Sequence, residues 1–233
     1  AREKPYTPSL HPFNWRGWWE YGTGALGDVG CHLIDIPFRT LGLRYPKDAE
    51  CSVGSVFTKM WNPDYHPEGC PPSSLITLNF DSTEKNDSPM QLTWTDGGIR
   101  PPHPDIIPPN SDIGGPGGEN GVLMIGEKGI ISTNINDSSP LTPKLYLYDG
   151  DTEFSPEKEE MSEPEYGHQR KWVDACKAGF NSNEHLDLTS SFDYAGPMTE
   201  TVLMGNLAIR SYMLRKESAN GGFDFFGRKK LLW

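Results

Sequence analysis

The sequence predicts an α+β fold, in which a large and mostly antiparallel open β-sheet carries helices packed on one face. Three observations predict this class. One helical pattern opens the chain at residues 24–43, a run of five or more short strand patterns follows, and two helical patterns close the chain. We expect residues 1–233 to form a single unit.

The opening segments differ in composition. Residues 1–17 are rich in proline and aromatic residues, which predicts an extended arm lying on a surface. Residues 24–43 place their apolar side chains on one broad helical face. Because Pro37 lies inside this pattern, we expect a kink or a break near Asp35 and Ile36.

Strand patterns and turn residues organise the middle of the chain. Apolar and polar residues alternate, or short apolar runs occur, at 51–57, 75–80, 91–95, 122–125, 130–133 and 144–148. The turn residues at 126–129 predict a hairpin. Proline and glycine mark 97–120 as a long loop, and 151–163 is acidic and expected in solvent. Helices are expected at 166–178 and 190–214, and residues 223–226 and 230–233 predict a last strand pair.

Composition excludes several classes of function. The chain of 233 residues has a formal charge of −11, with 21 Lys and Arg against 32 Asp and Glu, so it lacks the basic character of a nucleic-acid partner. No apolar run approaches the roughly 18–20 residues of a membrane span. The four cysteines include no CxxC pair, so we expect no metal site. No strand is followed by GxGxxG and a helix, the signature of a dinucleotide site.

The most informative segment is residues 22–35. On a helix, Asp28, His32, Asp35 and Arg39 lie four, three and four positions apart and share a stripe about 60° wide. A carboxylate beside an imidazole is the arrangement that proton transfer near neutral pH requires. The simpler alternative is that this stripe is the solvated face of an amphipathic helix.

Two features of the same segment favour a function. Glycine inside a helix costs roughly 1 kcal/mol, so a run of small residues indicates that a backbone or a ligand approaches closely. The small residues are Gly22, Gly24, Ala25, Gly27 and Gly30. Asp28 is also expected near the helix start, where the helix dipole favours a negative charge.

Several segments together resemble one enzyme family. Residues 12–35 read PFNWRGWWEYGTGALGDVGCHLID, and further similar runs lie at 121–129, 172–177, 190–208 and 227–233. This pattern resembles the C-terminal domain of the Gfo/Idh/MocA family, which includes glucose–fructose oxidoreductase and inositol dehydrogenase. The resemblance covers nearly the whole chain.

The resemblance implies that residues 1–233 are the C-terminal domain, for substrate binding and oligomerisation, of an NAD(P)-dependent oxidoreductase whose N-terminal Rossmann domain is absent from this chain. It places Asp28 and His32 as catalytic residues facing the nicotinamide, with NAD or NADP bound mainly by the missing domain. The family also uses a lysine in a Glu-Lys-Pro motif. Lys4 has that context, but it lies too close to Asp28 in sequence, and we assign it no role. The chain starts without Met and ends within an expected strand, so its compartment is not determined.

Five further residues are candidates for substrate binding: Trp15, Arg16, Asp35, Arg100 and His168. Trp15 offers an aromatic face for a sugar ring, with packing of the arm as the alternative. Arg100 lies in the proline-rich loop, either a cover over the substrate or a plain surface loop. His168 could contact a sugar substrate, or it could be a surface residue near the start of the helix expected at 166–178.

The functional hypothesis is that the complete enzyme transfers a hydride between NAD(P) and a hydroxyl carbon of a sugar, polyol or glycoside. His32 would accept the hydroxyl proton, and Asp28 would orient it. Some relatives use transient oxidation to cleave glycosidic bonds, so a hydrolase is an alternative. A further alternative is a non-catalytic domain that forms homo-oligomers through a sheet face rich in aromatic residues. This fragment alone is expected to be inactive.

Overall fold

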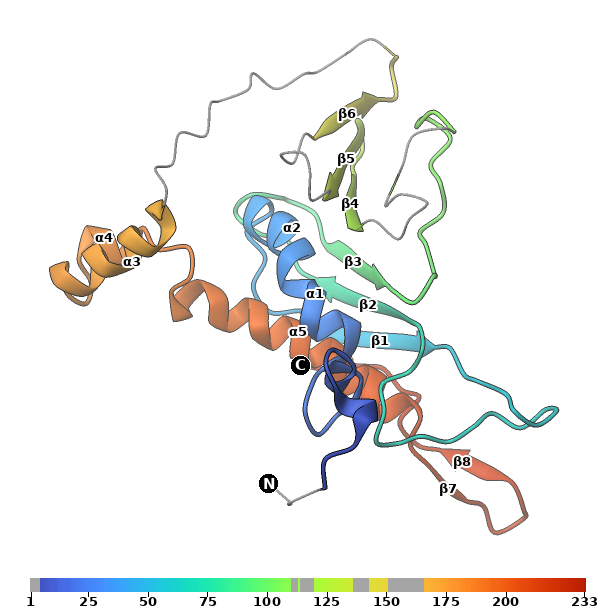
Figure 1. Cartoon of the computed structure of the whole chain (residues 1–233). Coiled ribbons are helices and arrows are strands. Elements are labelled where there is room, and N and C mark those ends of the chain that lie inside the picture. The colour runs from blue at the N-terminus through green and yellow to red at the C-terminus, as the bar shows by residue number, and fades with distance from the viewer. Residues whose placement is uncertain (1–4, 110–112, 114–119, 136–142, 151–165) are drawn as a thin grey trace.

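The computed structural model describes residues 5–109, 113, 120–135, 143–150 and 166–233 (Figure 1). Lys4 and the acidic segment 151–163 lie outside these residues, as does most of 110–119. The described chain has helices and antiparallel sheets, which confirms the α+β class.

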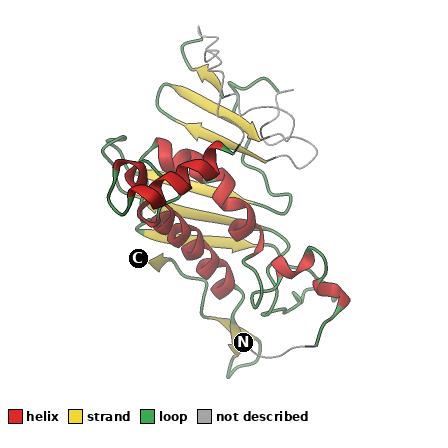
Figure 2. Ribbon diagram, turned by 60° about the vertical axis from the view of Figure 1, so that its left-hand side comes forward, coloured by secondary structure: helices red, strands yellow, loops and turns green. Residues whose placement is uncertain are grey.

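A four-stranded antiparallel sheet forms the centre of the described structure, with strand order β3-β2-β1-β9. Its strands are β1 (Asp48–Val53), β2 (Ser74–Phe80), β3 (Met90–Thr95) and β9 (Leu231–Leu232). Three helices cover one face of it: α1 (Gly24–Leu33), α2 (Asp35–Thr40) and α5 (Phe192–Tyr212). Figure 2 shows these helices on one side of the strands.

The hydrophobic core lies between this sheet and the helices. Side chains alternate along β2, so that Ile76, Leu78 and Phe80 are almost fully buried while Leu75, Thr77 and Asn79 are only partly buried. From the helices, Leu26 and Phe38 complete the core with 1% and 2% exposure. The core residues are therefore those that face the helices.

The opposite face of the sheet is mainly polar and carries no helix of the described chain (Figure 2). Cross-strand partners on this face include Glu50 with Thr77, and Thr77 with Thr93. Ser52 and Gln91 are exposed on it as well. The expectation of an aromatic-rich open face is therefore wrong for this sheet.

Pro37 has the predicted effect. The helix is interrupted at Ile34, and Asp35 begins a second helix. Proline has no N–H to donate to the preceding turn, so the hydrogen-bond series cannot run through it. The amide of Ile34 still bonds to Gly30, and the amide of Phe38 to Ile34, so the chain keeps a helical path across the break.

Two further sheets are separate from the central one. The predicted hairpin is confirmed as β4 (Asn120–Ile125) and β5 (Gly129–Ile135). A third strand, β6 (Lys144–Leu147), pairs with β5 to complete this sheet. The third sheet pairs β7 (Arg215–Glu217) with β8 (Phe223–Phe225). The described strands thus form three sheets instead of the single large sheet that we expected.

The predicted last strand pair is wrong. Residues 223–225 pair with the preceding strand β7 and not with 230–233, whereas Leu231 and Leu232 pair with β1. The reason is local, because Gly221 and Gly222 both have positive φ and close a tight hairpin between β7 and β8. Beyond it, Gly227 passes against the end of α5, where a Cβ atom would lie 1.9 Å from the Ser211 carbonyl oxygen.

The remaining elements lie outside the central layer. The opening arm contains two short 3₁₀ helices, η1 (Pro8–Leu10) and η2 (Asn14–Gly17), so it is not extended throughout. The helices α3 (Gly167–Ala178) and α4 (Asn183–Leu186) pack together near the first turn of α5 (Figure 1). None of the described helices is long and apolar enough to cross a membrane.

Neighbouring residues of β2 should differ sharply in their effect on stability. Ile76→Ala removes a fully buried side chain and should lower the free energy of unfolding by about 2–5 kcal/mol. Thr77→Ala acts on the polar face and should cost about 1 kcal/mol or less. Urea denaturation followed by circular dichroism measures both changes, and equal losses would contradict the placement of the core.

Candidate functional site

The start of α1 packs against the rest of the molecule. Gly24 has φ of 66°, a left-handed conformation, and the Cys70 Sγ atom lies 3.0 Å from where its Cβ would be. A Cβ at Gly27 would meet the Thr23 hydroxyl at 1.8 Å and Asn206 Nδ2 of α5 at 3.2 Å, and a Cβ at Gly30 would meet Leu26 Cδ1 at 3.2 Å and Val202 Cγ2 of α5 at 3.6 Å. The glycines of this helix therefore admit the protein's own side chains, and α1 and α5 approach closely.

The loop after β1 holds the segment that leads into α1. The amide of Cys70 donates to the Gly17 carbonyl at 2.7 Å, and the amide of Trp19 donates to the Glu68 carbonyl at 3.0 Å. The chain then turns tightly, since a Cβ at Gly22 would lie 2.6 Å from the Arg16 Cα. These contacts fix the position of Arg16 beside α1.

Arg16 and Asp28 form the central contact of the candidate site. The Arg16 Nε donates to the Asp28 Oδ2 at 2.8 Å, and both side chains are about one-third exposed. The guanidinium carbon also lies 4.1 Å from the centre of the Phe13 ring and 4.5 Å from that of Trp15. Three of the predicted site residues, Trp15, Arg16 and Asp28, are thereby brought together.

This arrangement changes the roles expected for these residues. Asp28 lies in the second turn of α1, past the four residues of the first turn on which the helix dipole acts most strongly. Its neighbouring positive charge is Arg16, so the carboxylate is already bonded to a residue of the arm. Trp15, 39% exposed, stacks on that same guanidinium. Trp15 therefore packs within the arm, as the alternative to sugar binding predicted.

His32 lies one turn after Asp28 on the same helix. Its side chain is exposed, and it has no hydrogen-bond or ion-pair partner among the described residues. An exposed imidazole without a fixed partner is available to take or give a proton at the surface. The structure therefore leaves His32 accessible but gives it no bond to Asp28.

Asp35 belongs to a second cluster, across the break in the helix. The Tyr194 hydroxyl at the start of α5 donates a hydrogen bond to Asp35 Oδ1, and Arg39 Nη2 lies 3.7 Å from the same oxygen. The Arg39 guanidinium stacks 4.7 Å from the centre of the Tyr194 ring. Burial, with the hydrogen bond to Asp35, raises the pKa of Tyr194 to about 12. Asp35 thus fastens α2 to α5.

A small cleft of about 120 Å³ opens at the start of α1. Trp19, Thr23, Cys70 and Asp96 are among the residues that line it. Burial raises the pKa of the Cys70 thiol to about 11, with a further contribution from Asp96, so the sulfur stays protonated at neutral pH. Asp96 is itself occupied, because it accepts hydrogen bonds from Ser74 and from the Trp94 indole N–H. The cleft therefore offers no reactive nucleophile.

The last two predicted site residues are not part of the Arg16–Asp28 cluster. Arg100 is exposed in the loop after β3, a few residues beyond the cleft-lining Gly97. His168 is exposed in the first turn of α3, which Figure 1 places away from α1. Over the part of the chain that is described, no group of three or more His, Cys, Asp or Glu side chains is arranged to hold a metal ion.

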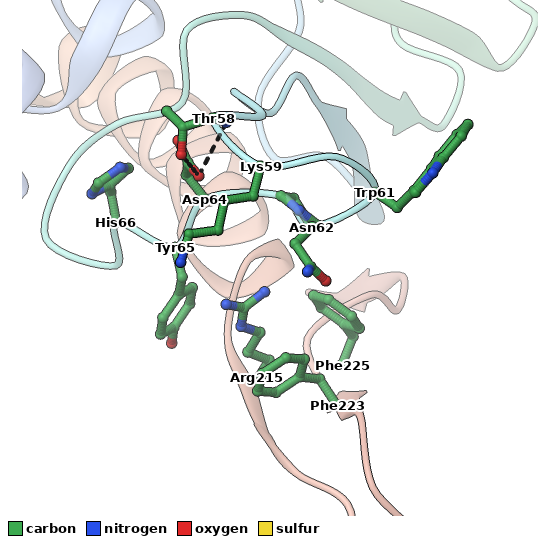
Figure 3. A pocket seen from close by; sticks show the side chains of 11 residues that line it. Thr58, Lys59, Trp61, Asn62, Asp64, Tyr65, His66, Arg215, Phe223 and Phe225 are labelled. Carbon is green, nitrogen blue, oxygen red and sulfur yellow. Dashed lines mark hydrogen bonds between the residues drawn. The ribbon is translucent and has the colours of Figure 1, made fainter.

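Sequence reasoning missed two features. Tyr194 is 159 positions from Asp35, and only the packing of α5 on α2 brings them together. A groove of about 790 Å³ between residues 58–66 and the β7–β8 hairpin was also missed (Figure 3). Its only sequence signal is the aromatic character of both segments, which include Trp61, Tyr65 and Phe223.

The chain matches no family model and shows no significant similarity to a curated protein. The interpretation of the site therefore depends on its own chemistry: an exposed imidazole on a helix whose neighbouring carboxylate is held by a stacked arginine.

Tyr194→Phe should change how stability depends on pH. The pKa of this hydroxyl rises from 10.0 to about 12 on folding, so its contribution is complete below pH 10 and disappears as the pH rises toward 12. The variant should lose about 1 kcal/mol at neutral pH and fall less steeply than the parent between pH 10 and 12. Urea midpoints at several pH values test this, and parallel curves would contradict it.

Proposed function

We propose that this chain is the substrate-side domain of an NAD(P)-dependent oxidoreductase acting on a hydroxyl carbon of a sugar, polyol or glycoside. The observation that carries the proposal is His32, exposed four residues after Asp28 on a glycine-rich helix. The resemblance of residues 12–35 to the Gfo/Idh/MocA family supports it from the sequence.

The dinucleotide itself would be bound by polypeptide outside this chain. All strand pairs among the described residues are antiparallel, whereas a dinucleotide fold requires a parallel βαβ unit. When bound, NAD(P) supplies the hydride acceptor. The α1 face with His32 would form one wall of the substrate site and meet the cofactor domain there.

His32 would act as the proton acceptor. As the substrate C–H bond breaks and its electron pair leaves as hydride, the hydroxyl O–H proton passes to the imidazole, and a carbonyl forms. Asp28, held by Arg16, would be a positioning residue that keeps a negative charge one helical turn away. Trp15 and Phe13 would present ring surfaces beside this face, with exposures of 39% and 62%. Arg100 is also proposed as a substrate contact, whereas Asp35 is bonded to Tyr194 and His168 lies on α3, outside this face.

His32→Ala tests the proposal in the full-length gene product. It should lower kcat/KM for the best sugar or polyol by about 10²–10⁴-fold, mostly through kcat, because the proton moves in the transition state. The rate of cofactor reduction is measured from the near-ultraviolet absorbance of the reduced cofactor. Cys31→Ser, the exposed neighbour on α1, is the matched control and should leave the rate unchanged.

Two outcomes would count against the enzyme. One is a full-length product that reduces neither NAD nor NADP with any sugar or polyol. The other is a His32→Ala variant with unchanged kcat, which would make His32 a surface residue and transfer the role of base to another group.

Self-association is the second candidate function. The surface available for it is the sheet face that no described helix covers (Figure 2). Glu50, Ser52 and Gln91 are exposed polar residues of this face. A second copy of the chain placed on this face would pair polar side chains across a two-fold axis. We propose a homo-oligomer formed in this way.

A charge placed in the middle of the open face should separate the subunits. Thr77→Arg puts like charges opposite each other in a two-fold interface and should shift the chain toward monomer at micromolar concentration. Sedimentation velocity measures the change. Thr199→Arg, at an exposed position of α5, is the control and should have no effect. A parent chain that is already monomeric would contradict the interface.

A further inference from the structure

The groove between residues 58–66 and the β7–β8 hairpin is independent of the site on α1. Its volume of about 790 Å³ falls within the roughly 300–1,000 Å³ of small-molecule pockets. It is formed by a loop and a hairpin more than a hundred positions apart in the sequence. Figure 3 shows Arg215 extending between these two segments.

The Arg215 guanidinium lies close to two aromatic rings, one from each of the two segments. Its guanidinium carbon lies 4.4 Å from the centre of the Tyr65 ring and 4.1 Å from that of Phe223. Stacking covers the flat faces of a guanidinium and leaves its N–H groups, which lie in the plane, free to donate. Arg215 is thus oriented without its hydrogen-bonding capacity being used.

The positive charge of Arg215 has no counter-charge in the described structure. No carboxylate or carbonyl of the described residues accepts a hydrogen bond from its side chain. Asp64 also lines the groove, but its carboxylate accepts from the Thr58 hydroxyl at 2.8 Å and points away from Arg215 (Figure 3). Lys59 adds a second positive charge to the lining. The lining therefore carries the two positive charges of Lys59 and Arg215 against the one negative charge of Asp64, in a chain of net charge −11.

We propose that this groove binds a small organic carboxylate with a ring-shaped body. The fork of the Arg215 guanidinium matches a carboxylate through two parallel hydrogen bonds. Phe225 and Tyr65 would contact the apolar face of the ring, and Asn62 is placed to bond polar substituents. An aromatic acid and a sugar acid share this chemistry, and they differ only in the ring that meets the aromatic side chains.

Comparing each acid with its neutral analogue separates the contribution of the carboxylate to the affinity from that of the ring. Isothermal titration calorimetry with phenylacetate against phenylacetamide tests the aromatic acid, and glucuronate against glucose tests the sugar acid. At least one acid should bind about 10-fold or more tightly than its neutral partner, because a hydrogen-bonded charge contributes more than a neutral contact. The pair with the larger difference identifies the ring. Equal binding of acid and neutral analogue in both pairs overturns the proposal.

Arg215→Gln should weaken binding of the preferred acid by about 10–100-fold. Arg44→Gln is the control, since Arg44 also lies over an aromatic ring, that of Tyr45, and neither residue lines the groove. It should change affinity by less than about twofold. Unchanged affinity in Arg215→Gln, or an equal loss in both variants, overturns the assignment.

Lys59→Gln is a second variant that tests the role of positive charge in the groove, and it serves if Arg215→Gln does not fold. Lys59 is exposed, so its replacement leaves the fold intact and should weaken binding of the acid by a few-fold, with no effect on the neutral analogue. An acid affinity that changes neither with this variant nor with added salt overturns the proposal, because screening weakens any exposed charge interaction. Failure of these tests would leave the oxidoreductase proposal untouched, since it depends on His32.

Discussion

The close contact between α1 and α5 over the central sheet is the constraint on which the described structure depends. A Cβ at Gly205 would lie 2.7 Å from Leu26 Cδ2 and 3.5 Å from Ile76 Cγ2, so α5, α1 and β2 meet at one point. From the side of α1, a Cβ at Gly27 would lie 3.2 Å from Asn206 Nδ2 of α5, although its nearest neighbour would be the Thr23 hydroxyl before the same helix. Larger residues here would separate the helices and expose the core around Ile76 and Leu78.

This contact determines where the polar groups of the α1 surface lie. With its glycine side against α5, α1 turns Asp28 toward the arm and leaves His32 in solvent. The break at Ile34 then directs Asp35 toward Tyr194 at the start of α5. One helix thus carries two separate polar clusters, because its two halves pack against different neighbours.

Stacked arginines recur in the described structure and stabilise its connecting segments. Arg16 lies over Phe13 and Trp15, Arg39 over Tyr194, and Arg215 over Tyr65 and Phe223. The first two also reach a carboxylate, Asp28 and Asp35 respectively, whereas Arg215 reaches none among the described residues. Arg228, over Tyr212 and Phe225, also reaches no carboxylate among the described residues, but of these two arginines only Arg215 lines the groove. Arg215 is therefore the stacked arginine that we propose for ligand binding.

The sequence by itself determined the elements whose signals are local. The helix at 24–43 with its break at Pro37, the hairpin around 126–129 and the strands at 75–80 and 91–95 follow from periodicity, proline and turn residues, and the structure confirms them. Only the tertiary structure decided which strands pair and which charges meet. Leu231 and Leu232 pair with β1, Arg16 bonds to Asp28, and Tyr194 bonds to Asp35. No local pattern predicts these contacts, because each depends on how separate segments pack. The loop after β1 places Arg16 beside α1, and the packing of α5 against α2 places Tyr194 beside Asp35.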